Sequence, residues 1–336
     1  MSPREAQSSG DQYEALVARL LAGDRHALAR AITLVESTRA DHRIDAEAVI
    51  DRVLPFAGKS IRIGISGSPG VGKSTLIEAF GMSLIGKGHK VAVLAVDPSS
   101  RLTGGSILGD KTRMEHLSRA EAAFIRPSPA GRTLGGVARR TREAITLCEA
   151  AGFDFILVET VGVGQSETAV ADMVDLFGLL LQPAAGDELQ GIKKGIVELA
   201  ELILVTKGDG EMLPVAERTA ADYRAALRLL RPPSATWLPE VITVSGLTGS
   251  GLDKAYDAIR RHQDLLEAVG ERTARRAAQA QAALWSDFGD ALLEIMKRRP
   301  DVAQTIPQIE QEVRAGQLTP AAGVRRLLTV MLAPRD

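Results

Sequence analysis

Eight consecutive residues, 67–74, have the types and the spacing of a phosphate-binding loop. They read Gly-Ser-Pro-Gly-Val-Gly-Lys-Ser and match the pattern G-x-x-x-x-G-K-S/T at every position. In such a loop, glycines allow backbone N–H groups to converge on phosphate oxygens at the start of the next helix. The apolar run 61–65 stands directly before the loop, as the preceding strand should. A glycine-rich turn without a ligand is the alternative, and the order of strand, loop and helix disfavours it.

Two side chains of this loop have expected chemical roles. Lys73 is expected to reach the β and γ phosphates of a nucleotide and to act in catalysis. The hydroxyl of Ser74 is expected to bind Mg²⁺. The predicted phosphate-binding set is Gly67, Ser68, Pro69, Gly70, Val71, Gly72, Lys73, Ser74 and Thr75.

Acidic residues that follow two later apolar runs are candidate Mg²⁺ ligands. Asp97 ends one run, Asp110 lies in the glycine-rich stretch after it, and Glu159 ends the next. Ligands of open α/β sheets lie beyond the carboxyl ends of the strands, where these residues fall. Glu159 stands where many GTPases have Asp, so a water-mediated contact with Mg²⁺ is favoured. Helix capping is the alternative for Asp97 and Asp110.

The residues expected around the γ phosphate predict slow hydrolysis. Gly162 is placed so that its N–H can sense this phosphate, but Val163 follows where Ras-like GTPases carry a water-orienting glutamine. Gln165 stands two places too far along. Lys193, in a glycine-rich and charged segment, is a catalytic candidate that could pair with Glu159 or the phosphates. A solvated surface lysine is the alternative.

Two segments farther along resemble the motifs that recognise guanine. In the first, residues 206–209, Asp209 would accept hydrogen bonds from N1–H and the exocyclic amine of guanine, as in N-K-x-D. Thr206 replaces the Asn, so affinity is expected to suffer while Asp209 still sets the base choice. Residues 245–247 are close to the motif whose backbone N–H contacts guanine O6. The predicted base-binding residues are Lys207, Asp209, Ser245, Gly246 and Leu247, which together favour GTP over ATP.

Composition excludes several classes of protein. The chain has 336 residues, 45% of them hydrophobic, and a formal net charge of -1, which gives no electrostatic case for nucleic acid as a partner. Its one cysteine, Cys148, excludes an intramolecular disulfide framework. No apolar run has the length of a membrane span or the form of a signal peptide. A cytoplasmic protein without membrane contact is therefore expected.

The elements that must position these residues form an α/β fold in three parts. Short runs that are apolar on consecutive positions predict strands buried on both faces, and so a mainly parallel sheet covered by helices on both sides. These runs are 61–65, 91–96, 153–158, 174–181, 202–205 and 241–244. The predicted parts are a helical extension, 1–57, a P-loop GTPase domain, 58–262, and a helical arm, 263–336.

The predicted arm offers more apolar surface than a short helical tail can bury on itself. Its apolar stripes include Trp285, Phe288, Ile295, Val302, Ile309 and Leu328. A homodimer through the arm is therefore predicted. The segment 271–280 is strongly helix-forming but lacks large apolar anchors, so it is expected to be exposed. Contact of this basic helix with RNA is the alternative.

Longer segments make the chain resemble one family, the MeaB/ArgK family of methylmalonyl-CoA mutase-associated GTPases, from about residue 12 to 333. The segments are GSPGVGKST (67–75), VDPSS (96–100), GGSILGDKTRM (104–114), ETVGVGQSE (159–167) and DELQGIKKG (187–195). The resemblance implies a GTPase domain of the signal-recognition/MinD class, which binds GTP or GDP with Mg²⁺, and a C-terminal dimerisation arm. It further implies a partner, adenosylcobalamin-dependent methylmalonyl-CoA mutase, whose cofactor loading is gated and whose activity is protected.

Three other functions are alternatives to this resemblance. A MinD-like or ParA-like ATPase would carry a lysine at the position of Ser68. A metallochaperone GTPase of the nickel type needs a His/Cys cluster, whereas the five histidines are scattered along the chain. A nucleotide-gated binding module with negligible turnover is the strongest alternative.

Overall fold

The structure is a computed structural model that describes residues 13–96, 114–127, 134–160, 166–183, 194–229 and 232–332. The chain divides into two compact units, Met1–Gln279 and Ala280–Asp336, and each is described by itself. The boundaries predicted after residues 57 and 262 stay predictions.

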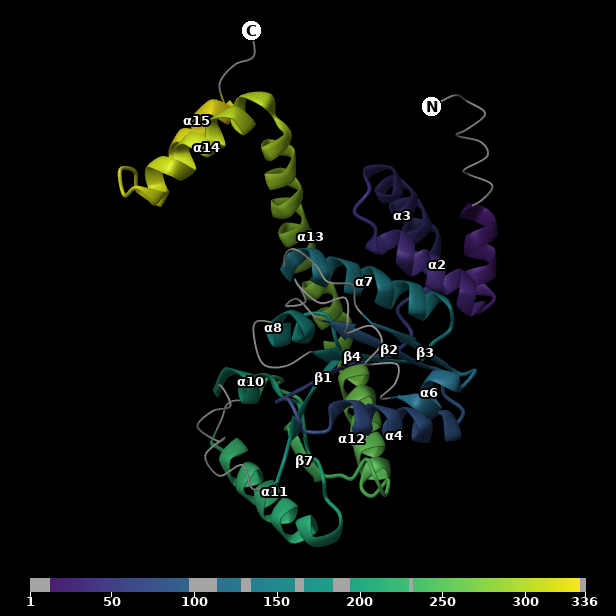
Figure 1. The fold of residues 1–336 in the computed structure, drawn as a ribbon. Helices are drawn as coiled ribbons and strands as arrows, with labels where there is room; N and C mark the ends of the chain where they lie inside the picture. Colours follow the sequence, from purple (N-terminus) through teal and green to yellow (C-terminus); the bar gives the residue numbers. More distant parts are fainter. Residues whose placement is uncertain are drawn as a thin grey trace. The chain divides into compact units, whose positions relative to one another are not determined.

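The first unit is built on a seven-stranded sheet whose paired strands all run parallel (Figure 1). The strand order is β3-β2-β4-β1-β5-β6-β7. The central strands β4 and β5 are buried at every position, as runs of consecutive apolar residues predict. The strands are β1 Ile61–Gly67, β2 Val91–Val96, β3 Ala123–Arg126, β4 Phe155–Thr160, β5 Leu176–Leu181, β6 Leu202–Val205 and β7 Glu240–Thr243. The predicted fold class is confirmed.

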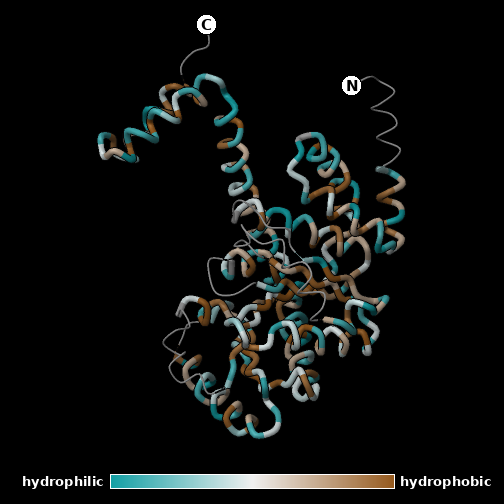
Figure 2. The backbone as a smooth tube through the Cα atoms, viewed as in Figure 1, coloured by the Kyte–Doolittle hydropathy of each residue, from teal (hydrophilic) through white to brown (hydrophobic). Residues whose placement is uncertain are grey.

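Helices cover both faces of the sheet, and each face has its own hydrophobic core. Alternate residues of one strand divide between the two cores: Ala92 and Leu94 belong to one, Val91 and Val93 to the other. Figure 2 shows the hydrophobic residues concentrated along the strands. The first core contains α7 Leu134–Ala150, α8 Ser166–Ala171, α10 Lys194–Leu199 and α11 Leu213–Leu227. The second contains α4 Lys73–Gly86, α6 Glu115–Arg119 and α12 Leu252–Ala268.

The amino-terminal helices share the first core. They comprise a helix over 13–21, then α2 Arg25–Glu36, α3 Ala40–Val53 and the short 3-10 helix η1 Leu54–Phe56. The carboxylate of Asp24 begins α2 by accepting hydrogen bonds from the N–H groups of His26 and Ala27, at 2.8 and 3.1 Å. Leu28 and Ile32 of α2 are fully buried. This helical extension therefore packs as one more layer over a face of the sheet. The single cysteine, Cys148 of α7, is buried in the same core.

Strand β3 was missed by the sequence analysis. Its four residues, Ala-Phe-Ile-Arg, pair only with β2, at the edge of the sheet. Only three of them are apolar, and Arg126 pairs with Glu36 of α2. An edge strand needs less apolar surface than a central one, so the run was too short to be recognised.

The start of α13, Glu271–Arg298, lies against the amino ends of the strands. None of its residues is buried and several within 271–280 are exposed as predicted, but Arg275 and Arg276 are half-buried. Arg276 donates to both carboxylate oxygens of Asp175, at 2.7 and 2.6 Å. Arg275 does the same to Glu201, at 3.0 and 2.7 Å. Asp175 directly precedes β5 and Glu201 directly precedes β6.

A third buried acid completes this group. Glu149 of α7 accepts two hydrogen bonds from Arg62 of β1, at 2.9 and 2.8 Å, and one from Ser60, at 2.6 Å. The side chains of the three acids are at most 3% exposed. Hydrogen bonds to a carboxylate replace the water that burial removes. We name these six residues the amino-edge cluster: Arg62, Glu149, Asp175, Glu201, Arg275 and Arg276.

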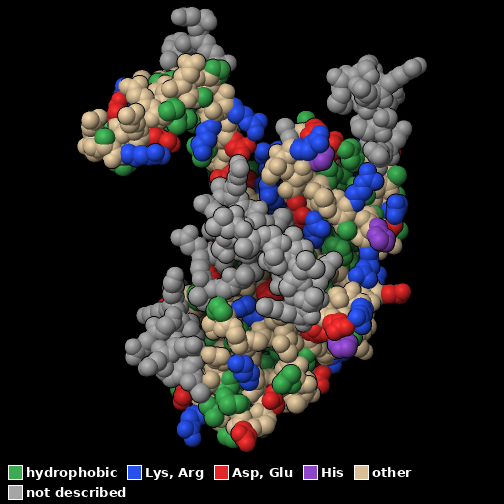
Figure 3. Space-filling view, viewed as in Figure 1, with side chains coloured by type: hydrophobic (Ala, Val, Ile, Leu, Met, Phe, Trp, Pro, Cys, Tyr) green, Lys and Arg blue, Asp and Glu red, His purple; other side chains and the backbone are tan. Residues whose placement is uncertain are grey.

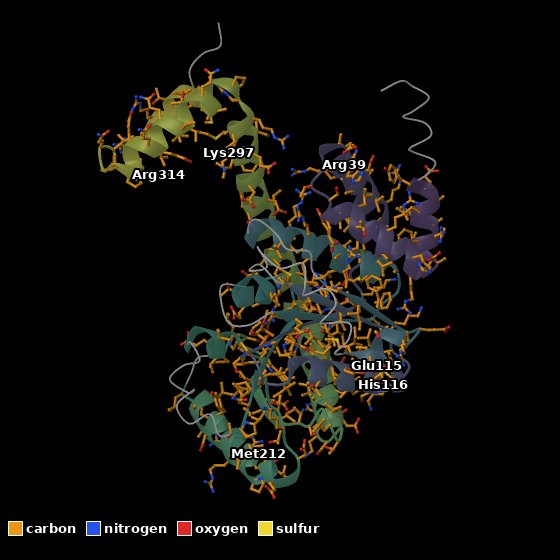
Figure 4. The ribbon with its side chains drawn as sticks, viewed as in Figure 1. Arg39, Glu115, His116, Met212, Lys297 and Arg314 are labelled. Atoms are coloured by element: carbon orange, nitrogen blue, oxygen red, sulfur yellow. The ribbon has the colours of Figure 1, made fainter. Side chains whose placement is uncertain are left out.

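The second unit consists of the end of α13, α14 Pro300–Arg314 and α15 Pro320–Leu332. Val302 and Ile309 of α14 are buried, and a Cβ on Gly323 of α15 would lie 3.1 Å from Ile309, so the two helices approach closely. Lys297 and Arg314 (Figure 4) lie in the last turns of α13 and α14, where positive charge suits the helix dipole. Several large apolar side chains of this unit stay exposed, among them Leu284, Trp285, Phe288, Ile295 and Val324.

Candidate nucleotide site

The predicted phosphate loop joins β1 to α4 at the carboxyl edge of the sheet. Gly70 and Gly72 have φ values of 80° and 97°, in the left-handed region that glycine adopts without strain. A Cβ on Gly67 would lie 2.7 Å from the carbonyl oxygen of Leu180, so only glycine fits there. Helix α4 begins at Lys73 without a side-chain cap, which leaves the N–H groups of its first turn to other acceptors. This geometry suits an anion.

Lys73 lies folded onto the loop. Its ammonium donates to the carbonyl oxygens of Gly67 and Ser68, at 2.6 and 3.2 Å. Burial lowers the pKa of Lys73, and the negative charges of Glu159 and Glu167 oppose that shift. Both acids are buried, at 6% and 1% exposure. The charges of two buried carboxylates therefore act on the predicted phosphate-binding lysine.

Glu167 is a site residue that the sequence analysis missed. It stands in the first turn of α8, directly after the segment that contains Gly162 and Gln165. Its place at the end of the segment 159–167 is a local sequence signal, but that signal alone does not indicate its role. Its charge acts on the same lysine as that of Glu159.

The structure describes two of the four predicted Mg²⁺ ligands, Ser74 and Glu159. Ser74 lies in the first turn of α4, and Glu159 lies near the end of β4, opposite Ile65 of β1 and Ala95 of β2. A hydroxyl and a carboxylate are oxygen donors of the kind that Mg²⁺ prefers, so these residues fit the ion. Asp97, Asp110, Gly162 and Lys193 lie outside the described residues.

The two segments predicted to read the base lie side by side. The hydroxyl of Ser245 donates to the carboxylate of Asp209 and accepts from the N–H of Leu247, at 3.1 Å. A Cβ on Gly246 would lie 3.1 Å from the carbonyl of Thr75, so this segment also touches the first turn of α4. The structure therefore brings together the two predicted base motifs and the end of the phosphate loop.

Thr206 and Lys207, at the start of the segment 206–209, both make side-chain hydrogen bonds to other segments. Thr206 is 3% exposed, and its hydroxyl lies 2.7 Å from the carbonyl oxygen of Val71 in the phosphate loop. Lys207 has a φ of 54°, the one positive value at a non-glycine residue in the described part of the chain. Its ammonium donates to the amide oxygen of Gln182, at 3.2 Å, just beyond the end of β5.

Other kinds of site find little support in the described residues. No group of three or more His, Cys, Asp or Glu side chains is arranged there to hold a metal ion. None of the described helices is both long and apolar enough to cross a membrane. On the face drawn in Figure 3, Lys and Arg side chains are interspersed with Asp and Glu.

A family model matches most of the chain. Residues 28–301 match the model described as methylmalonyl Co-A mutase-associated GTPase MeaB.

Similar proteins carry related names. A putative GTPase of Caulobacter vibrioides is 57% identical over 94% of this chain and 96% of its own length. The mitochondrial methylmalonic aciduria type A homolog of mouse is 50% identical over 92% of this chain and 77% of its own length. The crystal structure of a LAO/AO transport system kinase superposes with a TM-score of 0.76 at 39% identity, and covers 96% of this chain and 98% of that one.

Proposed function

The chain belongs to the MeaB family of methylmalonyl-CoA mutase-associated GTPases, and we propose that it acts as a GTP-dependent chaperone of adenosylcobalamin-dependent methylmalonyl-CoA mutase. In this role it gates cofactor loading and protects the mutase from inactivation. The observation that carries the nucleotide half of the proposal is the junction of three segments: the phosphate loop, Asp209 and Ser245. The family and the mouse relative support the partner.

The proposed chemistry is hydrolysis of GTP to GDP and phosphate. Lys73 holds the β and γ phosphates, while Ser74, Asp97, Asp110 and Glu159 hold Mg²⁺ or its waters. The ion would neutralise charge that develops on the phosphates as the bond to the γ phosphorus breaks.

Completion of the site by a partner is part of the proposal. Lys193 and Glu159 act around the γ phosphate, and Val163, in place of a glutamine, keeps turnover slow until the mutase binds. If the mutase accelerates hydrolysis, its affinity must also differ between the GTP and GDP forms, since coupling between two ligands is reciprocal.

A homodimer through the second unit completes the proposal. The exposed side chains of Trp285, Phe288 and Ile295 are 66%, 55% and 63% accessible, which is unusual for large apolar residues grouped along one helix. The rings of Trp285 and Phe288 stand edge to face, 6.0 Å apart. A second copy would cover such a face.

Single-turnover hydrolysis tests this function. GTP, Mg²⁺ and excess protein are mixed with and without purified mutase, and phosphate release is followed, with Lys73→Ala as the inactive control. The proposal expects slow release alone and faster release with the mutase. Nucleotide-dependent binding to the mutase without faster release would favour a binding module with negligible turnover. No association with GDP, GTP or a non-hydrolysable analogue would contradict the chaperone role.

A further inference from the structure

One buried hydroxyl joins the phosphate loop to the base-reading segment. The Oγ1 atom of Thr206 lies 2.7 Å from the carbonyl oxygen of Val71 and 3.1 Å from that of Leu181. A hydroxyl has one hydrogen to donate, and the shorter distance assigns it to Val71. The carbonyl of Leu181 already accepts the N–H of Thr206, at 2.8 Å.

The acceptor of this bond stands between two glycines of the phosphate loop. Val71 stands between Gly70 and Gly72, whose φ values of 80° and 97° reflect glycine's freedom to take conformations that other residues avoid. The Val71 residue itself is fully buried. Because a buried carbonyl is costly to leave without a donor, the Thr206 hydroxyl favours one orientation of this peptide unit.

The residues that follow Thr206 in the chain are those predicted to read the base. Lys207 follows it, and Asp209, which accepts the hydroxyl of Ser245, stands two residues beyond. Thr206 is thus part of the backbone that presents Asp209, while its side chain points to the phosphate loop. The side chain therefore does not itself read the base.

We propose that Thr206 is a positioning residue that holds the phosphate loop and the base-reading segment at the spacing a guanine nucleotide requires. This inference rests on the proposed nucleotide function and acts through Val71. A nucleotide spans both segments, so a fixed spacing lowers the conformational cost of binding. The hydroxyl that stands in place of the expected Asn thus has a partner of its own. The weaker affinity expected from this replacement stays a prediction.

Affinities for two purine nucleotides test the inference. Thr206→Val keeps the branched shape but removes the donor, and Thr206→Ser keeps the hydroxyl. Thr219→Val is the control, because it removes a hydroxyl bond to the carbonyl of Val215 within one turn of α11. Calorimetry measures GDP and IDP, which lacks the 2-amino group. In Thr206→Val both affinities should fall about tenfold with their ratio unchanged. Thr206→Ser and Thr219→Val should bind both nucleotides as the parent does.

Three outcomes would count against parts of this argument. A GDP affinity that falls while the IDP affinity stays parental in Thr206→Val would overturn the inference, because only the contact with the 2-amino group would then be lost. Unchanged affinities combined with a lower melting temperature would also overturn it, leaving only a structural role. If the parent binds ADP as tightly as GDP, the proposed guanine function fails instead, and the effect of Thr206→Val on the loop is measured with ADP.

Discussion

The two edges of the central sheet are held by different chemistry. At the carboxyl edge, Lys73 and Thr206 donate to backbone carbonyls, Ser245 donates to the carboxylate of Asp209, and glycines shape the loop. At the amino edge, the amino-edge cluster buries three carboxylates against arginines. The same strands connect both: β1 starts beside Glu149 and ends in the phosphate loop.

The two edges should therefore contribute differently to the stability of the sheet. Removing one member of a buried ion pair leaves an uncompensated charge, whereas a hydroxyl contact is exchanged at lower cost. Ligand-binding loops belong to the less stable parts of proteins by necessity. We therefore expect substitutions at the amino edge to lower the stability of the sheet, and substitutions at the carboxyl edge to act mainly on ligand binding.

The largest expected effect comes from breaking the amino edge. Arg276→Met leaves Asp175 buried without its main partner and should lower the free energy of unfolding by about 3–5 kcal/mol. Urea denaturation measures it, and GDP affinity of the folded variant should stay parental. Arg298→Met, which removes an exposed pair with Glu294, is the matched control. A parental urea midpoint for Arg276→Met would show that the two edges do not differ.

Removing one charge at the carboxyl edge should weaken nucleotide binding and leave the free energy of unfolding unchanged. Asp209→Asn removes two charge-assisted hydrogen bonds to guanine and should weaken GTP binding by roughly 3 kcal/mol. XTP, whose 2-oxo group suits an amide donor, should bind the variant better than GTP does. Asp253→Asn on α12, an exposed carboxylate paired with Lys87, is the control. Equal affinity of parent and Asp209→Asn for GTP would refute the base assignment.

Acid should weaken the amino-edge cluster and so lower the stability of the protein. Burial alone would raise the pKa of Glu149, Asp175 and Glu201, but hydrogen bonds and the charges of their partners outweigh it and lower all three. A lowered pKa adds stability above the ordinary carboxylate range, and this contribution is lost as pH falls through that range and below. Urea midpoints should therefore decline as the pH falls below about 4–5.

Glu201→Gln sharpens this pH experiment, because one of the three carboxylates then no longer titrates. The decline of its urea midpoint with acid should be shallower than that of the parent. An equally steep decline would show that Glu201 does not contribute to the acid sensitivity.

The smallest effect on the sheet is expected from removing the second unit. A chain that ends at residue 279 keeps Arg275 and Arg276, so it should bind GDP as the full chain does but behave as a monomer in light scattering. A chain that ends at residue 268 loses both arginines and should be less stable. A dimer that persists in the 1–279 chain would move the proposed interface to the first unit.

Sequence patterns predicted the sheet and the phosphate loop because both are local. A central strand is a run of apolar residues, and the loop is eight residues with fixed spacing. The amino-edge cluster has no such pattern, since Arg276 and Asp175 stand 101 positions apart. Before folding brings them together, the arginines of α13 look like the solvated face of an ordinary helix.

The candidate site, like the fold, was predictable where its residues stand in local motifs. Lys73, Asp209 and Ser245 stand in recognisable motifs, and the structure brings their segments together. The link from Thr206 to Val71 joins positions 135 apart, and no spacing rule anticipates a hydroxyl that serves a backbone carbonyl. Glu167 was missed for a different reason: it is local, but its meaning comes from the lysine it faces.

Cys148 makes the chain convenient for site-specific labelling. It is the only cysteine in the sequence, its side chain is fully buried, and burial raises the pKa of its thiol, so little thiolate forms at neutral pH. A maleimide dye or a nitroxide would react with an introduced surface cysteine, such as Arg298→Cys, and leave Cys148 untouched. Energy transfer or electron-spin distances between two copies could then be recorded without first replacing a native thiol.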